Sequence, residues 1–261
     1  MCYNVLMDTI TSPNNRIVKA VRALRGRKGR DAANVFLAEG IKFVAEIGYG
    51  WDIRQVVLSE TFYRHEGALH FGEKAVVVTD QIFAGLSDVV NPQGILAVVE
   101  KRDFCINKVL ADDLPLIFVL EDINDPGNLG TILRNCHGLG ATGIILAGSC
   151  ADIYSPKAVR ASAGSIFHVP FAHMSMKRAA EELKGRNIAL YATSPAGEAA
   201  LHRLNLQNPT AFALGNEHNG LTPQAMDLAD ETVQIPVISE SLNVSIACAI
   251  CAYEAWRQRN V

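Results

Sequence analysis

The second half of the chain alternates short, uninterrupted apolar runs with segments of helical character. Residues 116–121 read Leu-Ile-Phe-Val-Leu-Glu, a second run occupies 143–147, and further strands are expected at 187–192, 211–215 and 232–236. Apolar runs of this length are typical of strands that are buried on both faces of a sheet. Strands that alternate with helices at this spacing predict an α/β fold with a mostly parallel sheet and helices on both of its faces.

Two helices are expected to frame this sheet. One begins near residue 128, and the other runs from about residue 242 to residue 259. Apolar residues of the second helix recur at spacings of four and three, which predicts a single stripe that packs against another surface. The stripe consists of Leu242, Ile246, Ala249, Tyr253 and Trp256.

The first half of the chain predicts a smaller α/β domain. A basic helix around 14–25 and a loop rich in Gly and Arg precede a strand at 35–40, which leads into a helix from Ile41. Further strands are expected at 55–58, 75–78 and 95–99. A weakly patterned stretch at 101–114 is the expected linker, so the predicted domains are 1–107 and 108–261.

Bulk properties of the 261-residue chain narrow its class. Its 49% hydrophobic and 20% charged residues are those of a globular protein. No apolar run reaches the roughly 18 residues that span a membrane. The start, Met1-Cys2-Tyr3-Asn4, lacks the basic and apolar regions of a secretory signal. The sequence therefore predicts a cytoplasmic protein with no membrane partner.

Six scattered cysteines are too few for a disulfide framework in a chain of this length. Cys248 and Cys251 form a C-x-x-C, but they lie in an Ala- and Ile-rich helical segment, and no second pair completes a zinc site. We expect buried thiols here and no bound metal.

A cluster of positive charge stands out against the net charge of −3. No acidic residue interrupts residues 16–30, so nothing within this segment pairs with its cations. A solvated amphipathic helix followed by a loop is the alternative, but the absence of acidic neighbours favours contact with phosphates. The predicted RNA-binding residues are Arg16, Lys19, Arg22, Arg25, Arg27, Lys28 and Arg30.

Ligands of open parallel sheets bind at the carboxyl ends of strands, and three such ends carry unusual residues here. The first, 125–135, reads Asp-Pro-Gly-Asn-Leu-Gly-Thr-Ile-Leu-Arg-Asn. Asn128 stands where a helix N-cap is expected, and Arg134 follows nearly two turns later; a cap and a surface charge would explain both. Gly127 and Gly130 do not complete G-x-G-x-x-G, which argues against a dinucleotide site.

The second strand end, 213–221, reads Ala-Leu-Gly-Asn-Glu-His-Asn-Gly-Leu. Gly215 and Gly220 would allow the backbone to approach a ligand closely, and Glu217 stands at the exit of the strand. A plain Asn-Gly turn is the alternative explanation.

The third strand end, 235–245, reads Ile-Pro-Val-Ile-Ser-Glu-Ser-Leu-Asn-Val-Ser. Ser241 is a candidate cap for the last helix. Asn243 is harder to explain, because it interrupts an otherwise apolar helix start.

The order and spacing of these strand ends resemble the three motifs of the SpoU/TrmH methyltransferases of the SPOUT superfamily. Those motifs are D-P-x-N-L-G-x-x-x-R, then L-G-x-E-x-x-G-L, then I-P, a short loop and S-L-N-V-S, and all three occur here within residues 122–250. The first half of the chain is similar to the L30e-like substrate-binding domain that often precedes this catalytic domain. Asn14, Lys19 and the Phe-Leu-Ala-Glu-Gly of 36–40 fall in matching places.

The resemblance implies a catalytic domain whose C-terminal segment threads through a loop to form a deep trefoil knot, and it implies a homodimer. It also implies S-adenosylmethionine as the cofactor and a ribose 2′-hydroxyl of RNA as the methyl acceptor. The positions that match cofactor contacts are Gly215, Gly220, Ile235, Leu242 and Asn243. The positions that match catalytic and RNA-placing residues are Asn128, Arg134, Glu217, Ser241 and Asn243.

Methyl transfer to a ribose oxygen needs in-line placement and loss of the hydroxyl proton, and it needs no metal. Arg134 matches the residue usually regarded as the base in the family, but a guanidinium group holds its proton so firmly that it is a poor acceptor. We therefore expect Arg134 to be essential but electrostatic, anchoring a phosphate and stabilising the developing alkoxide. Asn128 and Asn243 would orient the ribose and the loops, and Glu217 would fix either Arg134 or its own loop.

Rival interpretations remain open at this point. A non-catalytic RNA-binding or ribosome-assembly protein of the same fold would be expected to lose Arg134, Asn243 or the loop at Gly215, and all are present. A Rossmann-type enzyme needs a glycine fingerprint after its first strand, which this chain lacks. By analogy, the extended N-terminal domain favours ribosomal RNA over transfer RNA as the substrate.

Overall fold

The structure, a computed structural model, describes residues 7–48, 50–68, 71–238 and 241–260, which form two compact units. The first contains the described residues up to Arg102 together with Tyr154–Arg160, and the second contains Asp103–Ile153 and the described residues from Ala161 onward. The chain therefore leaves the first unit inside the stretch expected to be a linker. Outside the described residues lie Met1, Cys2, Tyr3 and Asn4 of the expected signal-free start, and Ser239 and Glu240 of the third motif.

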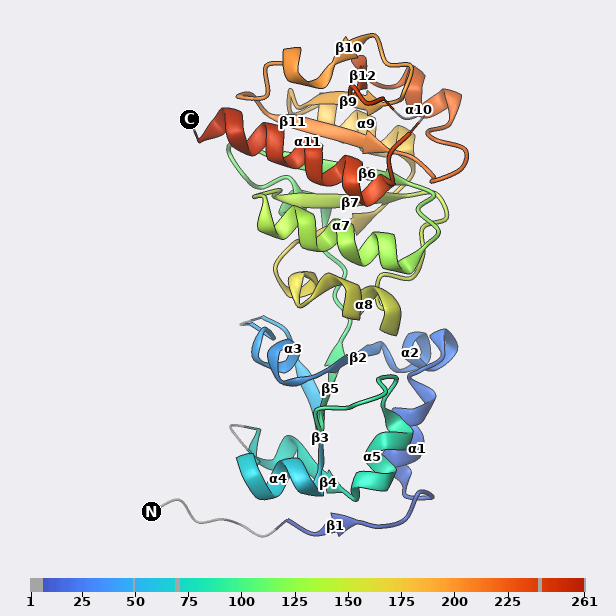
Figure 1. The fold of residues 1–261 in the computed structure, drawn as a ribbon, viewed down its shortest axis with the longest axis vertical. Coiled ribbons are helices and arrows are strands. Elements are labelled where there is room, and N and C mark those ends of the chain that lie inside the picture. Colours follow the sequence, from blue (N-terminus) through green and yellow to red (C-terminus); the bar gives the residue numbers. More distant parts are fainter. Residues whose placement is uncertain (1–6, 49, 69–70, 239–240, 261) are drawn as a thin grey trace. The chain divides into compact units, whose positions relative to one another are not determined.

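A seven-stranded sheet forms the centre of the second unit (Figure 1). Its strand order is β10-β12-β9-β11-β6-β7-β8, and every pairing between neighbours is parallel. This confirms the predicted parallel sheet. The strands are β6 (Leu116–Glu121), β7 (Gly143–Ala147), β8 (Phe171–His173), β9 (Ala189–Thr193), β10 (Ala199–Ala200), β11 (Thr210–Leu214) and β12 (Glu231–Gln234).

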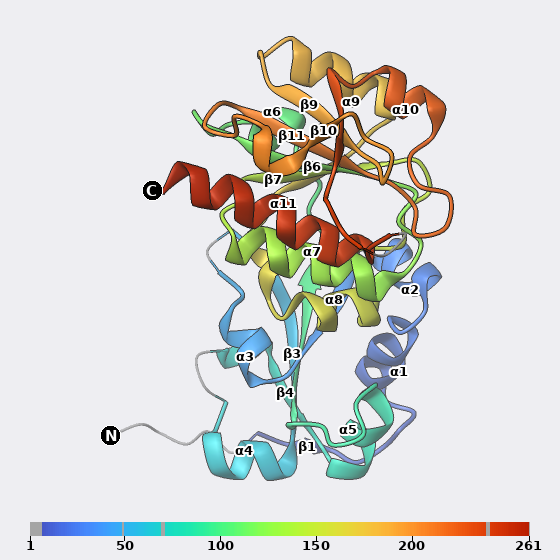
Figure 2. The same cartoon turned by 45° about the horizontal axis from the view of Figure 1, so that its top comes forward.

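Helices cover both faces of this sheet, because its central strands are apolar on both sides. On one face, α6 (Ile106–Val109), α9 (Met176–Lys184) and α10 (Pro223–Asp227) contribute side chains to a shared core with the strands. On the other, α7 (Pro126–Gly138) and α11 (Val244–Arg259) lie side by side, as Figures 1 and 2 both show. The two helices that carry the first and third motifs are therefore neighbours.

Both of these helices begin with a cap that differs from the predicted one. Asp125 caps α7: its Oδ1 accepts the backbone N–H of Asn128 at 2.9 Å, and Pro126 opens the helix. Proline is favoured at this first position because it has no N–H to leave unpaired. Asn243, and not Ser241, caps α11 through an Oδ1 that accepts the N–H of Ser245 at 2.9 Å. Asn128 therefore lies in the first turn of its helix.

The face of α11 that packs within the chain is not the predicted apolar stripe. Small residues face inward, and Cys248, Cys251, Ala252 and Ala255 are all buried. Small side chains let α11 approach α7 closely, and the sulfur atoms of Cys136 and Cys248 lie 3.9 Å apart. By contrast, Ile246, Tyr253 and Trp256 of the predicted stripe are exposed, by 50%, 52% and 44%.

The thiols of the C-x-x-C are buried, as predicted. Burial raises the pKa of the Cys251 thiol to about 12, since the thiolate would lack solvation. Burial likewise raises the pKa of Cys248, with a further contribution from nearby Cys136. Among the described residues, no helix combines the length and apolar character that crossing a membrane requires.

The first unit is built on a five-stranded mixed sheet of order β1-β4-β3-β5-β2. Its strands are β1 (Thr9–Ile10), β2 (Val35–Glu39), β3 (Ile53–Ser59), β4 (Ala75–Val78) and β5 (Ile95–Glu100). Its helices are α1 (Arg16–Ala23), α2 (Arg27–Ala33), α3 (Ile41–Ala45), α4 (Glu60–Glu66), α5 (Asp80–Leu86) and most of α8 (Pro156–Ser162). The loop expected after α1 is thus a second helix, α2, because Gly26 only interrupts the helical segment.

Candidate active site at the carboxyl ends of the parallel strands

A cavity of about 370 Å³ lies at the carboxyl ends of β9, β11 and β12. Its volume falls within the range of about 300–1,000 Å³ that is usual for small-molecule sites. It lies where open parallel sheets bind ligands. Six of the predicted site residues line it: Gly215, Glu217, Gly220, Ile235, Ser241 and Leu242.

Gly215 lies where the loop after β11 folds back on itself. A Cβ at this position would meet the backbone carbon of Gly220 and the backbone nitrogen of Leu221, each at 2.2 Å. Backbone atoms cannot rotate away as a side chain can, so only glycine fits this crossing. The loop reverses at Gly220, whose φ of +68° lies in the left-handed region. The sequence therefore provides a tight backbone wall beside the cavity.

A hydrogen-bonded chain joins the three motifs behind this wall. The Asn128 side chain donates from Nδ2 to Oε1 of Glu217 at 2.8 Å, and its Oδ1 accepts from Nδ2 of Asn243 at 3.1 Å. The amide of Asn128 is therefore oriented by a carboxylate on one side and an amide on the other. Asn243 has a double role, because its own Oδ1 caps α11. Residues more than 80 positions apart are thus held within one network.

Arg134 lies on an exposed part of α7 and does not line the cavity. It forms no ion pair with any residue in the described part of the chain. Among the described residues the Glu217 carboxylate therefore contacts Asn128 and makes no ion pair with Arg134. The alternative, that Glu217 fixes its own loop, agrees with this contact.

Several cavity residues were not singled out from the sequence. They include Thr193 at the end of β9, Ser194 and Pro195 directly after it, and His218 in the loop after β11. A signal for the first group was present, because a polar Thr-Ser-Pro turn follows a predicted strand at the same edge of the sheet. The structure also places Asn135 in the helix pair: its Nδ2 donates to the backbone oxygen of Ser245 at 2.7 Å and links α7 to α11.

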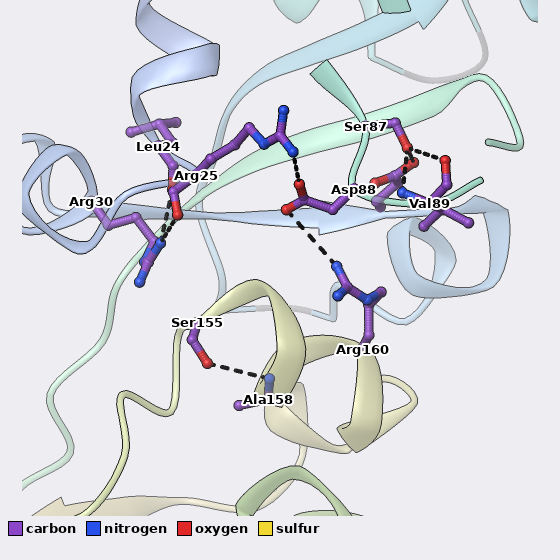
Figure 3. A network of polar contacts seen from close by, with 10 residues as sticks. Leu24, Arg25, Arg30, Ser87, Asp88, Val89, Ser155, Ala158 and Arg160 are labelled. Atoms are coloured by element: carbon purple, nitrogen blue, oxygen red, sulfur yellow. Dashed lines mark hydrogen bonds and ion pairs between the residues drawn. The ribbon is translucent and has the colours of Figure 1, made fainter. Parts of the chain in front are cut away.

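Arg30, in the basic segment of the first unit, does not lie at the surface as an RNA-binding residue would. Its side chain is only 3% exposed, and Nη1 donates to the backbone oxygens of Leu24 and Arg25 at 3.0 and 2.8 Å (Figure 3). Carbonyls at the end of a helix lack partners within the helix. The guanidinium of Arg30 donates hydrogen bonds to such carbonyls at the end of α1. The prediction that Arg30 contacts RNA is therefore corrected: it is a structural residue.

Two other cations of this segment have acidic partners. Arg25 pairs with Asp88, whose second oxygen lies 4.0 Å from Nη1 of Arg160 on α8 (Figure 3). Arg27 lies 3.5 Å from Asp31. Asp88 is remote in sequence, so inspection of the segment alone could not reveal it. Four cations are exposed and form no ion pair with residues that the structure describes: Arg16, Lys19, Arg22 and Lys28.

Comparison with known proteins gives a consistent result. Residues 115–253 match the SpoU rRNA Methylase family, and residues 15–97 match the MRM3-like substrate binding domain. The 23S rRNA (guanosine(2553)-2′-O)-methyltransferase of Bacillus subtilis is 29% identical, with 95% of this chain and 98% of the relative aligned.

Solved structures are similar to this chain over different extents. The AdoMet-bound rRNA methyltransferase from Sinorhizobium meliloti has a TM-score of 0.87 at 30% identity, covering 96% of this chain and 98% of its own. A TrmH/SpoU tRNA modifying enzyme from A. aeolicus covers only 59% of this chain and 80% of its own, with a TM-score of 0.50 at 28% identity. With its three motifs gathered at one edge of a parallel sheet, the chain belongs to the SpoU rRNA methylase family.

Proposed function

We propose that this protein transfers a methyl group from S-adenosylmethionine to a ribose 2′-hydroxyl of ribosomal RNA. The observation that carries the proposal is the convergence of the second and third motifs on one cavity, with the first motif joined to them by the contacts of Asn128 with Glu217 and Asn243. A non-catalytic protein of this fold would have no need to keep that linkage together with an exposed arginine at 134.

The cavity fits S-adenosylmethionine, which supplies a methyl group activated on a sulfonium. The backbone crossing at Gly215 leaves no room for a side chain, so peptide groups can approach a flat ligand closely. Apolar and polar groups both line the space, as a nucleoside with a charged amino acid requires. The residues that would hold the cofactor are Gly215, Gly220, Ile235, Leu242 and, through the start of α11, Asn243.

The acceptor RNA would approach from the exposed side of α7. Arg134 would bind a phosphate with its planar fork of N–H donors and stabilise negative charge on the reacting oxygen. Asn128 and Asn243 would position the ribose, and Glu217 would hold the Asn128 amide in one orientation. Ser241, exposed at the cavity rim, is placed to contact the RNA or the cofactor. We further propose that the C-terminal segment of the catalytic domain, 108–261, threads through a loop to form a deep trefoil knot.

Ribosomal RNA is favoured over transfer RNA by the extent of the similarity. The rRNA enzymes from Bacillus subtilis and Sinorhizobium meliloti share both units with this chain, whereas the tRNA modifying enzyme from A. aeolicus is similar over an extent close to that of the catalytic part. Domain 1–107 would thus be the RNA-binding part. The direct test is transfer of labelled methyl groups by the purified protein to ribosomal RNA and to transfer RNA in parallel. Preferential labelling of transfer RNA would contradict the choice of substrate, and no labelling of either would contradict the activity.

The exposed cations of α1 and α2 are expected to make the salt-dependent part of RNA binding. Each phosphate neutralised on single-stranded RNA contributes about 0.7 to the slope of log affinity against log salt. Replacing Lys19, Arg22 and Lys28 by Gln should therefore lower the slope by up to about 2 and leave S-adenosylmethionine affinity unchanged. Filter binding across a salt series measures this. The control is Arg64→Gln on α4, and equal slopes for parent and triple variant would refute the assignment.

We also propose that a second copy of the chain covers the exposed apolar stripe of α11. Ile246, Tyr253 and Trp256 share one helix face, and a stripe of large apolar residues of this kind marks an interface. A self-complementary patch is the usual basis of a homodimer.

Sedimentation analysis at micromolar concentration should give twice the chain mass for the parent and the single chain mass for Ile246→Glu/Trp256→Glu. The control is Val90→Glu, a change at an exposed apolar residue of the first unit, which should leave the dimer intact. A monomeric parent, or a dimeric double variant, would contradict the proposal.

A further inference from the structure

The Asn216 side chain, at the unspecified position between Gly215 and Glu217 of the second motif, organises the loop between Gly215 and Leu221. Its Oδ1 accepts two backbone N–H groups, from His218 at 2.9 Å and from Asn219 at 3.2 Å. Its own backbone exchanges two hydrogen bonds with Gly220, at 3.1 and 2.9 Å. A side-chain acceptor two residues before a donor replaces a turn of backbone and fixes the chain direction. The loop that lines the cavity is therefore closed from within.

The same side chain also ties the loop to a different strand. Its Nδ2 donates to the backbone oxygen of Asp122 at 2.9 Å, immediately after β6 and 94 residues away in the sequence. A loop that is closed only on itself could still swing as a unit about its two ends. The contact with Asp122 restricts that freedom, because it fastens the loop beside the end of the neighbouring strand β6, in addition to the hydrogen bond between Glu217 and Asn128.

Asp122 is a firm point of attachment because its side chain is held by the chain segment that follows β7. Its φ is +55°, in the left-handed region, where aspartate is among the few tolerated residues. Its Oδ1 accepts the backbone N–H of Ser149 at 2.6 Å. The carboxylate fills the space where Gly148 lacks a side chain, since a Cβ there would lie 2.3 Å from Oδ1. The ends of β6, β7 and β11 are thereby joined through one residue.

The orientation of Glu217 depends on this arrangement. Glu217 follows Asn216 directly, and its carboxylate accepts the hydrogen bond that orients Asn128. A shift of the loop would move both the cavity wall and this carboxylate. We propose that Asn216 is a positioning residue that holds the loop at Gly215–Leu221 in its cofactor-binding conformation by fastening it to Asp122. This inference rests on the proposed function, because it assigns the cavity to S-adenosylmethionine.

Loss of the Asn216 side chain is expected to weaken cofactor binding. Without the Asn216 side chain, the free loop samples other conformations, and ligand binding must restore the competent one. The substitution therefore lowers the affinity for the cofactor, while the complex, once formed, reacts at nearly the normal rate. A residue that touched the reacting atoms would instead lower kcat.

The test compares Asn216→Ala and Asn216→Ser with the parent in S-adenosylmethionine calorimetry and in methyl-transfer kinetics. For Asn216→Ala we expect the Kd and the KM for the cofactor to rise about tenfold, which is about 1.4 kcal/mol, with kcat within about twofold of the parent. Serine can accept from the residue two positions on but is too short to reach Asp122. Asn216→Ser should therefore give an intermediate rise, about threefold, and it guards against misfolding of the alanine variant.

The matched control is Asn205→Ala. Asn205 also closes a turn, accepting the N–H of Gln207 at 3.1 Å, but it lies before β11 and not after it. Its Kd should equal that of the parent. If Asn216→Ala lowers the melting temperature of the unliganded protein but leaves Kd within twofold, or if it lowers kcat alone, the inference is overturned. A parent protein that does not bind S-adenosylmethionine would instead overturn the proposed function, and the two failures are thus distinguishable.

Discussion

Replacing Gly215 by alanine is expected to weaken S-adenosylmethionine binding by about a hundredfold. The new methyl group would lie 2.2 Å from backbone atoms of Gly220 and Leu221, so the loop must open to admit it. Overpacking that forces a backbone shift costs about 1–3 kcal/mol, and the upper part of that range corresponds to a hundredfold in affinity. Because the crossing forms one wall of the cavity, a shift of its backbone changes the surface that the ligand contacts. Calorimetric titration of the purified variant measures it.

A second glycine separates this effect from a general response to Gly→Ala substitution. At Gly138, near the end of α7, an added Cβ meets nothing within 4 Å. Gly138→Ala should therefore bind the cofactor as the parent does, and alanine in a helix should stabilise the fold slightly. If Gly215→Ala binds within fivefold of the parent, the cavity beside Gly215 is not the cofactor site.

Removal of the Arg134 side chain is expected to lower kcat by about 10²–10³, the loss typical of deleting one group that stabilises developing negative charge. The side chain is exposed and forms no ion pair in the described part of the structure, so the melting temperature should stay within about one degree of the parent. Cofactor affinity should also be unchanged, because Arg134 does not line the cavity. Single-turnover methyl transfer to ribosomal RNA provides the rate.

Two further variants define the role of this arginine. Arg178→Ala, an exposed arginine of α9 on the other face of the sheet, is the control and should retain the full rate. Arg134→Lys keeps the charge but loses the planar fork, and we expect it to remain strongly impaired. A lysine enzyme that keeps most of the maximal rate would contradict a bidentate contact with phosphate.

The strands of the second unit were predictable because burial on both faces determines which residue types a short segment contains. A strand buried on both faces is apolar along its length, as β7 is throughout and β6 is at every position before its last residue, Glu121. The cluster of motif residues was predictable for a related reason, since the carboxyl ends of neighbouring parallel strands meet at one edge. Local sequence and a simple rule of topology were sufficient for both.

The features that were missed depend on contacts between distant residues. The face of α11 that packs within the chain, with Cys248 and Ala252, was not singled out, because small residues are not conspicuous in an apolar pattern although they allow α7 to come close. Arg30 was assigned to the surface from its charge alone, although the carbonyls at the end of α1 require a donor. Periodicity and charge describe one segment at a time. They do not reveal which distant residues pack against that segment.

The helix caps show the same limit on a smaller scale. Asn128 and Ser241 are both good capping residues, yet Asp125 and Asn243 cap the two helices. Proline at the first helical position fixes the start of α7 one residue after Asp125. This displacement has a functional consequence, because it leaves the Asn128 side chain to bind Glu217 and Asn243.

Whether methyl groups from S-adenosylmethionine arrive on ribose oxygen is decided by one measurement. Ribosomal RNA is incubated with the purified protein and the isotopically labelled cofactor, then digested to nucleosides, and the position of the label is read by mass spectrometry. We predict a single labelled nucleoside whose fragments carry the methyl group on the sugar, and much less of this product from the Gly215→Ala protein at the same subsaturating cofactor concentration. Label on a base, or unmodified RNA after incubation with an intact, cofactor-binding protein, would contradict the account.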